Sequence, residues 1–357
     1  MTRDRMAQVP QRARLPASNP PQLLVFIDTE EEFDWQRSFL SDARGVTAMK
    51  HQWRAQTVFD RYGVKPAYLV DYPVAAQPDG YQPLREFLAD GRCEIGAHLH
   101  PWVTPPVEEE VGERHSFACN LPHDLERRKL VILKETIERN LGVAPTIYRA
   151  GRYGADAETR AALDELGFLI DSSVLPWTDL RHMAGPDFRH CSADPFWFGA
   201  SDRLLEIPLT TGFLGLLHRF GEDAFPWIGG TRGVRLRATA ICARTRLLDR
   251  IRLSPEGVTV AEAKRLTRAL VRRGEQKVFV VSYHSPSLGV GHTPYVRTRR
   301  DLEQFLGWLD DYLEFFMGEI GGRPASAHGI YRAMCAVEGR TPPQAAQPPG
   351  ELRRAAG

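Results

Sequence analysis

Residues 23–30 read Leu-Leu-Val-Phe-Ile-Asp-Thr-Glu, an apolar run that is followed at once by two carboxylates. A short, continuous apolar run is typical of a strand that is buried on both faces, as in a parallel sheet covered by helices. Beyond it, further runs of strand length alternate with segments whose apolar residues recur at helical spacing. Repeated β-then-α units predict a parallel sheet, either open or closed into a barrel. In such folds the chemistry lies on the loops that follow the carboxyl ends of the strands.

The alternation sets the expected extent of the folded part. Strands are predicted at 23–27, 67–70, 93–97, 146–149, 168–170, 204–207 and 277–282. Helices are predicted over about 47–62, 81–90, 130–141, 155–166, 259–274 and 302–316. These elements lie within residues 22–335, a length that allows one large α/β domain or two small ones. The flanking residues 1–21 and 336–357 are rich in Pro, Ala, Arg and Gln, and we predict that both are disordered tails.

Composition excludes several classes of function. Of the 357 residues, 43% are hydrophobic and 25% are charged, as in ordinary globular proteins. The net charge of +1 provides no general attraction for nucleic acid, so no nucleic-acid partner is expected. The five cysteines are odd in number and lack a C-x-x-C pair, which argues against a disulfide framework. No signal-peptide pattern and no apolar stretch of roughly 20 residues is present, so we expect a cytoplasmic protein.

Unusual polar side chains follow the predicted strands. They are Asp28 and Glu30 after the first strand, His98 and His100 after the third, and Arg149, Asp171 and His284 after later ones. Because the carboxyl ends of parallel strands meet at one edge, we expect these groups to converge on one mouth. Their joint occurrence at successive strand ends favours an active site over a set of incidental surface groups.

The stretch EIGAHLHPW, residues 94–102, places two histidines two positions apart. Side chains two apart on an extended segment point to the same side, so His98 and His100 could present two nitrogens to one ion. Neutral imidazoles suit zinc and similar metals, and a carboxylate such as Glu30 would complete an open three-ligand site. By itself H-x-H is a weak motif, and isolated histidines are more often ordinary core or surface residues.

Taken together, these residues resemble the polysaccharide deacetylase family, also called carbohydrate esterase family four or the NodB homology domain. Within that family the sequence looks most like the WalW-like branch associated with lipopolysaccharide biosynthesis. The resemblance covers about residues 22–335. It implies a single-domain, distorted (β/α) barrel with fewer than eight regular strands. It also implies a hydrolase that removes N- or O-acetyl groups from a sugar or glycan precursor, with a divalent metal, expected to be zinc, and an activated water.

The resemblance assigns roles to the first two motifs. FIDTEEEFDW, residues 26–35, resembles the acidic motif, which makes Asp28 the general base and Glu30 a metal ligand. The second motif is His-x-x-x-His, and this chain matches it through His98 but has Trp102 at the other position. By the strand-spacing argument, His100 is the candidate for the missing ligand.

The later motifs supply the remaining roles. In YRAGRYG, residues 148–154, Arg149 would orient the base, with Arg152 as a competitor, and the Tyr153 N–H would help to hold the oxyanion. In IDSSVLPW, residues 170–177, Asp171 would orient the catalytic histidine. In VSYHSPSL, residues 281–288, His284 would be the general acid. Trp102 and Trp177 could stack on sugar rings or could be core and rim residues.

An arginine-rich segment lies outside these motifs. Residues 232–252 contain seven arginines and one acid, Asp249, with apolar residues interleaved. The pattern predicts an amphipathic basic helix in part of this segment, which would contact an anionic membrane or hold the phosphates of a lipid-linked or nucleotide-linked sugar. The alternative is a solvated helix face.

Two rival functions remain open. A metal-independent glycosidase would use two carboxylates such as Asp28 and Glu30. A catalytically impaired sugar-binding barrel would keep the fold, and Trp102 at a ligand position favours it. Metal-dependent amidohydrolases also carry H-x-H, but on their first strand, whereas here the pair follows the third.

Overall fold

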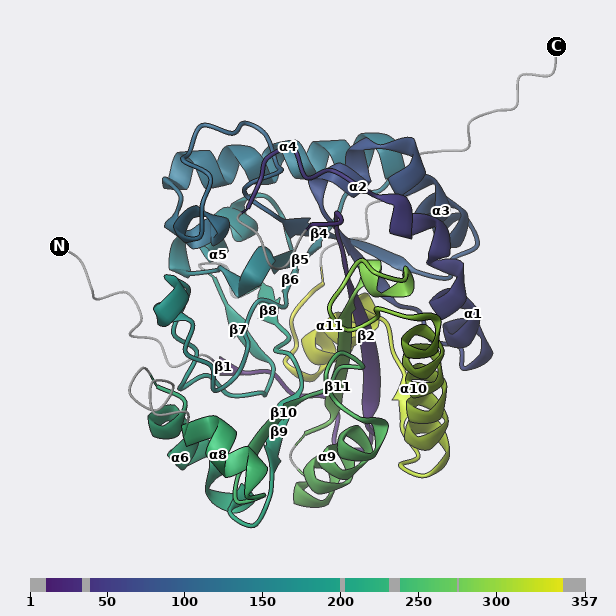
Figure 1. Cartoon of the computed structure of the whole chain (residues 1–357), viewed down its shortest axis with the longest axis vertical. Coiled ribbons are helices and arrows are strands. Elements are labelled where there is room, and N and C mark those ends of the chain that lie inside the picture. The colour runs from purple at the N-terminus through teal and green to yellow at the C-terminus, as the bar shows by residue number, and fades with distance from the viewer. Residues whose placement is uncertain (1–10, 34–38, 200–202, 231–237, 275, 343–357) are drawn as a thin grey trace.

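The computed structural model describes residues 11–33, 39–199, 203–230, 238–274 and 276–342. A curled, mostly parallel sheet lies at its centre and helices surround it (Figure 1). The parallel strands, in spatial order, are β11 (Val278–His284), β2 (Gln22–Thr29), β3 (Ala67–Val70), β4 (Glu94–Leu99), β5 (Ile147–Ala150), β6 (Ile170–Asp171) and β8 (Leu204–Glu206). Seven parallel neighbours among the described residues confirm the distorted barrel with fewer than eight regular strands.

The edges of the sheet close incompletely. Beyond β8, the antiparallel strands β7 (Phe196–Phe198) and β1 (Gln11–Arg12) continue the sheet, and β12 (Arg323–Pro324) pairs with β2. On the free side of β11, the Val280 N–H donates to Oγ1 of Thr210 at 2.8 Å, and the Ser282 N–H donates to the carbonyl of Leu253 at 3.2 Å. Single hydrogen bonds to these loops therefore replace a continuous ladder at the closure.

Helices pack around the sheet. They are α1 (Trp53–Arg61), α2 (Tyr72–Ala76), α3 (Pro78–Ala89), α4 (His123–Leu141), α5 (Ala157–Glu165), α6 (Gly221–Ile228), α8 (Ala238–Arg244), α9 (Val260–Arg273), α10 (Arg299–Gly318) and α11 (Ala327–Val337). Most of them cover the outer face of the sheet, whereas α11 packs with the apolar residues of the interior. The ends of the helices are set by capping residues. Thr259 and Glu262 form the predicted capping box at the start of α9, and Gly274 ends it in the left-handed conformation. None of the described helices has the length and apolar character needed to cross a membrane.

Alternate residues of each strand belong to two separate apolar layers. On β2, Leu23, Val25 and Ile27 pack against the surrounding helices, whereas Leu24 and Phe26 pack in the barrel interior. This period of two is the ordinary geometry of a strand. Fully burying one such side chain stabilises the fold by about 1.5–3 kcal/mol, so both layers hold the register firmly. Asp28 continues the interior series, and its carboxylate is therefore directed into the barrel.

The structure corrects the predicted tail boundaries. Residues 11–21 are not a disordered tail, since Gln11 and Arg12 form β1 and Leu15 is buried. Residues 336–342 likewise pack on the domain, where Glu338 accepts a hydrogen bond from the indole of Trp197 at 2.7 Å. Residues 1–10 and 343–357 lie outside the described residues. Composition missed these contacts because they are made by isolated side chains rather than by a periodic pattern.

The arginine-rich segment 232–252 agrees with the prediction in part. Among its described residues, Ala238–Arg244 form the helix α8, and residues 231–237 lie outside the described residues. Its last part forms strand β10 (Asp249–Arg252), which pairs antiparallel with β9 (Thr211–Leu214). Ile251 and Leu253 are buried two positions apart, and this strand spacing outweighs the helical pattern upstream.

Candidate active site

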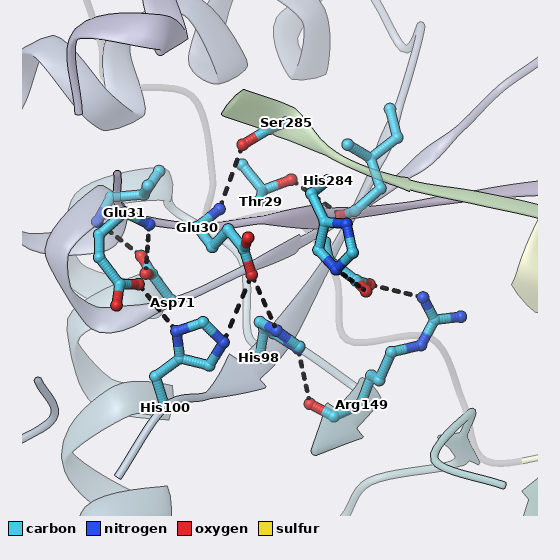
Figure 2. Close-up of polar contacts among 12 residues, drawn as sticks. Thr29, Glu30, Glu31, Asp71, His98, His100, Arg149, His284 and Ser285 are labelled. Carbon is cyan, nitrogen blue, oxygen red and sulfur yellow. Dashed lines mark hydrogen bonds and ion pairs between the residues drawn. The ribbon is translucent and has the colours of Figure 1, made fainter. Parts of the chain in front are cut away.

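The strand register brings four predicted residues together. His284 of β11 lies beside Asp28 of β2, and His98 of β4 lies beside Arg149 of β5. All four have the interior parity of their strands. Asp28, His98 and His284, with Glu30 just beyond β2, line a cavity of about 320 Å³. The predicted convergence at the carboxyl ends of the strands is therefore present in the geometry (Figure 2).

Asp28 is held as a carboxylate by an arginine that crosses the barrel. Nη1 of Arg149 donates to Oδ1 of Asp28 at 2.5 Å and to Oγ of Ser282 at 2.6 Å. Nε and Nη2 of the same side chain donate to the carbonyl and Oγ of Ser172, both at 2.9 Å. Burial alone would raise the pKa of Asp28, but Arg149 and two nearby histidines outweigh it and hold the pKa below its usual value. Arg149, and not its competitor Arg152, is thus the partner of this carboxylate.

Glu30, His98 and His100 direct three ligand atoms toward one point (Figure 2). Oε2 of Glu30 lies 3.6 Å from Nε2 of His98 and 3.4 Å from Nε2 of His100. These separations are long for hydrogen bonds. They match the spacing of about 3.3–3.5 Å expected between ligands around a tetrahedral zinc ion with bonds of about 2.0–2.1 Å.

Both histidines expose a lone pair toward Glu30. Nδ1 of His98 lies 3.0 Å from the carbonyl oxygen of Arg149, and Nδ1 of His100 lies 2.8 Å from Oε2 of Glu31. Those oxygens accept, so Nδ1 carries the proton in each ring and Nε2 remains unprotonated. Burial lowers the pKa of His98 to about 3 and that of His100 to about 4, which keeps both rings neutral.

The acidic groups around this point are those expected beside a bound cation. Burial, followed by the charges of Glu31 and Asp28, raises the pKa of Glu30 well above its usual value. Oε1 of Glu30 is buried and has no hydrogen-bond partner among the residues that the structure describes. A cation would ligate this carboxylate and offset the repulsion. Two imidazole nitrogens with one carboxylate are a donor set that suits zinc, so the residues fit the metal that the sequence predicted.

Trp102 supports His100 instead of serving as a ligand. Its indole Nε1 donates to Oε1 of Glu31 at 2.8 Å, and its ring stacks on His100 with 4.2 Å between centroids. Glu31 in turn accepts a hydrogen bond from Nδ1 of His100, and its backbone N–H donates to Asp71 at 2.7 Å. This chain of contacts fixes the orientation of the imidazole, as carboxylates commonly do for metal-binding histidines. Sequence reasoning missed Glu31 because it lies in an acidic run that resembles a solvated turn.

His284 is oriented by Glu256, which the sequence did not single out. Oε2 of Glu256 lies 2.7 Å from Nδ1 of His284, and Oε1 accepts from the His284 N–H at 3.1 Å and from Oγ of Ser287 at 2.6 Å. Burial would lower the pKa of His284, but Glu256 outweighs it and raises that pKa. Nε2 of His284 is 3.8 Å from Oδ2 of Asp28. Glu256 lies just beyond the carboxyl end of β10. Had β10 been recognised as a strand in the sequence, Glu256 would have been a candidate by the same argument as the other residues at strand ends.

The expectation that Asp171 orients His284 is therefore wrong. Asp171 lies in register with Tyr148 and Glu206, on the outer face of the sheet. Its Oδ1 accepts a hydrogen bond from Ser173, and Oδ2 has no hydrogen-bond partner. The neighbouring Ser172 faces the interior instead. Because β6 is only two residues long, the sequence did not show which of its side chains faces the interior and which faces outward.

The turn after β5 places the remaining predicted residues at the cavity wall. Arg152 and Tyr153 both line the cavity and have positive φ angles of 54° and 62°. Gly151 precedes them because a Cβ there would lie 2.5 Å from Cδ2 of His100. Trp177 does not line this cavity. It packs against Phe213 and borders a second cavity that contains Arg250.

Comparisons with known proteins establish the fold. No family model matches the sequence, and no curated protein matches it. A protein described as a polysaccharide deacetylase from Mycobacterium smegmatis is 18% identical with a TM-score of 0.54, over 95% of this chain and 100% of that one. One so described from Pseudomonas aeruginosa PAO1 is 15% identical with a TM-score of 0.50, over 88% and 91%. The Puue allantoinase is 15% identical with a TM-score of 0.50, over 91% and 96%. At these identities the likeness concerns the fold alone.

Proposed function

We propose that the chain belongs to the polysaccharide deacetylase family and hydrolyses an acetyl amide or ester on a sugar, with a zinc ion as cofactor. One observation supports this most. A three-ligand cradle made by Glu30, His98 and His100 shares a cavity with an ionised Asp28 and with His284. The fold of the described deacetylases from Mycobacterium smegmatis and Pseudomonas aeruginosa agrees with it.

The base side of the reaction uses Asp28. Glu30, His98 and His100 would hold a divalent ion, which would supply a Lewis acid able to polarise the acyl carbonyl and lower the pKa of water at the site. Asp28 takes a proton from the attacking water, and Arg149 keeps it ionised beforehand through a charge-assisted hydrogen bond. The N–H of Tyr153 helps to hold the negative charge that develops on the carbonyl oxygen.

The acid side uses His284. Glu256 holds Nδ1, so Nε2 is the nitrogen that faces the cavity and gives its proton to the departing amine or alcohol. The raised pKa of His284 keeps a larger fraction of the ring protonated near neutral pH. Base and acid thus lie on adjacent strands, with 3.8 Å between Oδ2 of Asp28 and Nε2 of His284 before substrate enters.

The finer assignment concerns where the substrate comes from. We propose an acetylated precursor of a cell-envelope glycan, in the manner of the WalW-like lipopolysaccharide branch, with the reaction in the cytoplasm. Ile241, Arg244, Arg246 and Leu247 are exposed, and together they suit peripheral contact with an anionic membrane. Pelleting with phosphatidylglycerol vesicles tests this contact, and loss of pelleting in Arg244→Glu/Arg246→Glu is the expected result.

The function is tested by metal content and product release. Purified protein should contain about one zinc per chain and release acetate from an acetylated amino sugar, and Asp28→Asn should abolish release while keeping the metal. Unchanged turnover in Asp28→Asn would reject the base assignment. Release of free sugar without metal would instead support a glycosidase, and glycan binding without metal or acetate release would support the impaired sugar-binding barrel.

A further inference from the structure

Two arginines line the cavity without a carboxylate partner. Among the residues that the structure describes, no carboxylate oxygen lies within 4.0 Å of the guanidinium of Arg152 or of Arg252. Both side chains are half-buried and line the cavity. Holding an unpaired guanidinium away from bulk water is costly unless an anion binds it. Neither guanidinium contacts Asp28, Glu30 or His284 through a hydrogen bond or ion pair among the described residues.

Arg252 is placed for binding by β10. Its Nη1 donates to the hydroxyl of Tyr153 at 2.7 Å, and this is its one hydrogen bond to the described residues. A guanidinium carries five N–H donors in a planar fork, so most of them remain available. Arg250 lies on the same side of β10, two residues earlier, and lines the adjoining cavity. Arg250 and Arg252 therefore give this side of β10 a positive charge.

Arg152 is held in place by a strained turn. Its φ of 54° and that of Tyr153, 62°, put two consecutive non-glycine residues in the left-handed region. Such conformations are costly and persist where surrounding contacts enforce them, often at functional sites. The Arg152 guanidinium lies between the rings of Phe39 and Phe117, 4.9 Å and 4.2 Å from their centroids. Nη1 also donates to Oγ of Ser116 at 2.5 Å.

The cavity is therefore lined by charges of both signs. Glu30 and Asp28 contribute carboxylates to its lining, and Arg252 and Arg152 contribute guanidinium groups. We propose that Arg252, assisted by Arg152 and the Tyr153 hydroxyl, binds a phosphate or carboxylate on the substrate, so that the physiological substrate is an anionic acetylated sugar. This inference rests on the proposed function for the acetyl group, and on the arginines alone for the anion. An arginine fork matches both kinds of oxyanion through paired N–H bonds.

The test measures binding without turnover. The full chain carrying Asp28→Asn is titrated by calorimetry with N-acetylglucosamine 1-phosphate, N-acetylmuramic acid and neutral N-acetylglucosamine. At least one anionic sugar should bind roughly 10- to 100-fold more tightly than the neutral one. Adding Arg252→Met should remove that advantage and leave the affinity for the neutral sugar unchanged. The stronger of the two anionic ligands identifies phosphate or carboxylate as the group that is recognised.

Two further variants control the interpretation. Arg268→Met removes an exposed arginine that pairs with Glu319, outside the cavity, and it should bind all three sugars like the parent. Arg252→Lys keeps the charge but loses the fork, so it should weaken anion binding by an intermediate amount even if the methionine variant does not fold. Inorganic phosphate should compete with the anionic sugar in the parent protein.

The outcomes separate this inference from the proposed function. Equal affinity for neutral and anionic sugars, or an equal loss for both in Arg252→Met, would overturn the anion site. Acetate release by the native chain is measured separately. Tight anion binding without acetate release from any acetylated sugar would reject the hydrolase and keep the anion site.

Discussion

Replacing Glu256 by glutamine should move the pH dependence of the reaction by a calculable amount. The carboxylate accepts three hydrogen bonds, two of them from His284, and it is only 5% exposed. A hydrogen bond to a charged group contributes about 1.5–3 kcal/mol. Because one pKa unit is worth about 1.4 kcal/mol, losing the charge should lower the pKa of His284 by about 1–2 units.

The sign follows from the proposed role of His284 as a general acid. Its pKa is raised in the folded protein, so the protonated ring persists to higher pH, and the rate falls as pH rises through that value. In Glu256→Gln this fall in rate should occur about 1–2 pH units lower. The maximal rate, reached at low pH, should be reduced by a smaller factor than the rate at high pH. The assay is acetate release over pH 5–9, with NMR titration of the His284 ring as a readout that does not depend on turnover. A fall that stays at the same pH, or moves upward, would refute the reasoning.

Further predictions concern metal binding, parity and burial. Removing a ligand in His100→Ala should weaken zinc binding by at least about 10- to 100-fold, as measured by elemental analysis after dialysis; full retention of zinc would contradict the cradle. Asp171→Asn should change the thermal midpoint but leave the acetate-release rate within about threefold, since that carboxylate lies on the outer face of the sheet. Burial raises the pKa of Glu126 to about 7, above its unfolded value, so native stability falls between about pH 4.5 and 7. The free energy of unfolding of Glu126→Gln, measured with urea, should exceed that of the native chain by an amount that grows by up to about 3 kcal/mol as pH rises across that range. A difference in unfolding free energy that does not change with pH would count against this. Gly151→Ala should weaken zinc binding, because its methyl would displace His100.

The sequence predicted those parts of the site that depend on long, regular strands. β2 and β4 were recognised as strands from their apolar residues, and Asp28, His98 and His100 lie at or just beyond their carboxyl ends, so these residues were correctly placed toward one mouth. The parallel pairing of the strands followed from the repeated β-then-α pattern. These features are local, and a single sequence carries them.

Errors arose where pairing between distant segments decides the structure. β6 is two residues long, and only its register with β5 and β8 shows that Asp171 faces outward. β10 is a strand because it pairs with β9, whereas the arginines upstream suggested a helix. Glu256 was missed for the same reason, since a loop after an unrecognised strand gives no sign of where it points.

The side chain of Arg149 joins parts of the chain that are more than a hundred residues apart. It is fully buried and contacts Asp28 of β2, Ser172 beyond β6 and Ser282 of β11, while its carbonyl accepts from His98. These bonds can form only when the barrel has curled far enough for its opposite walls to meet. An incompletely folded chain, with either end of the barrel detached, therefore lacks an ionised and aligned Asp28, and the proposed hydrolysis requires the whole domain to have assembled.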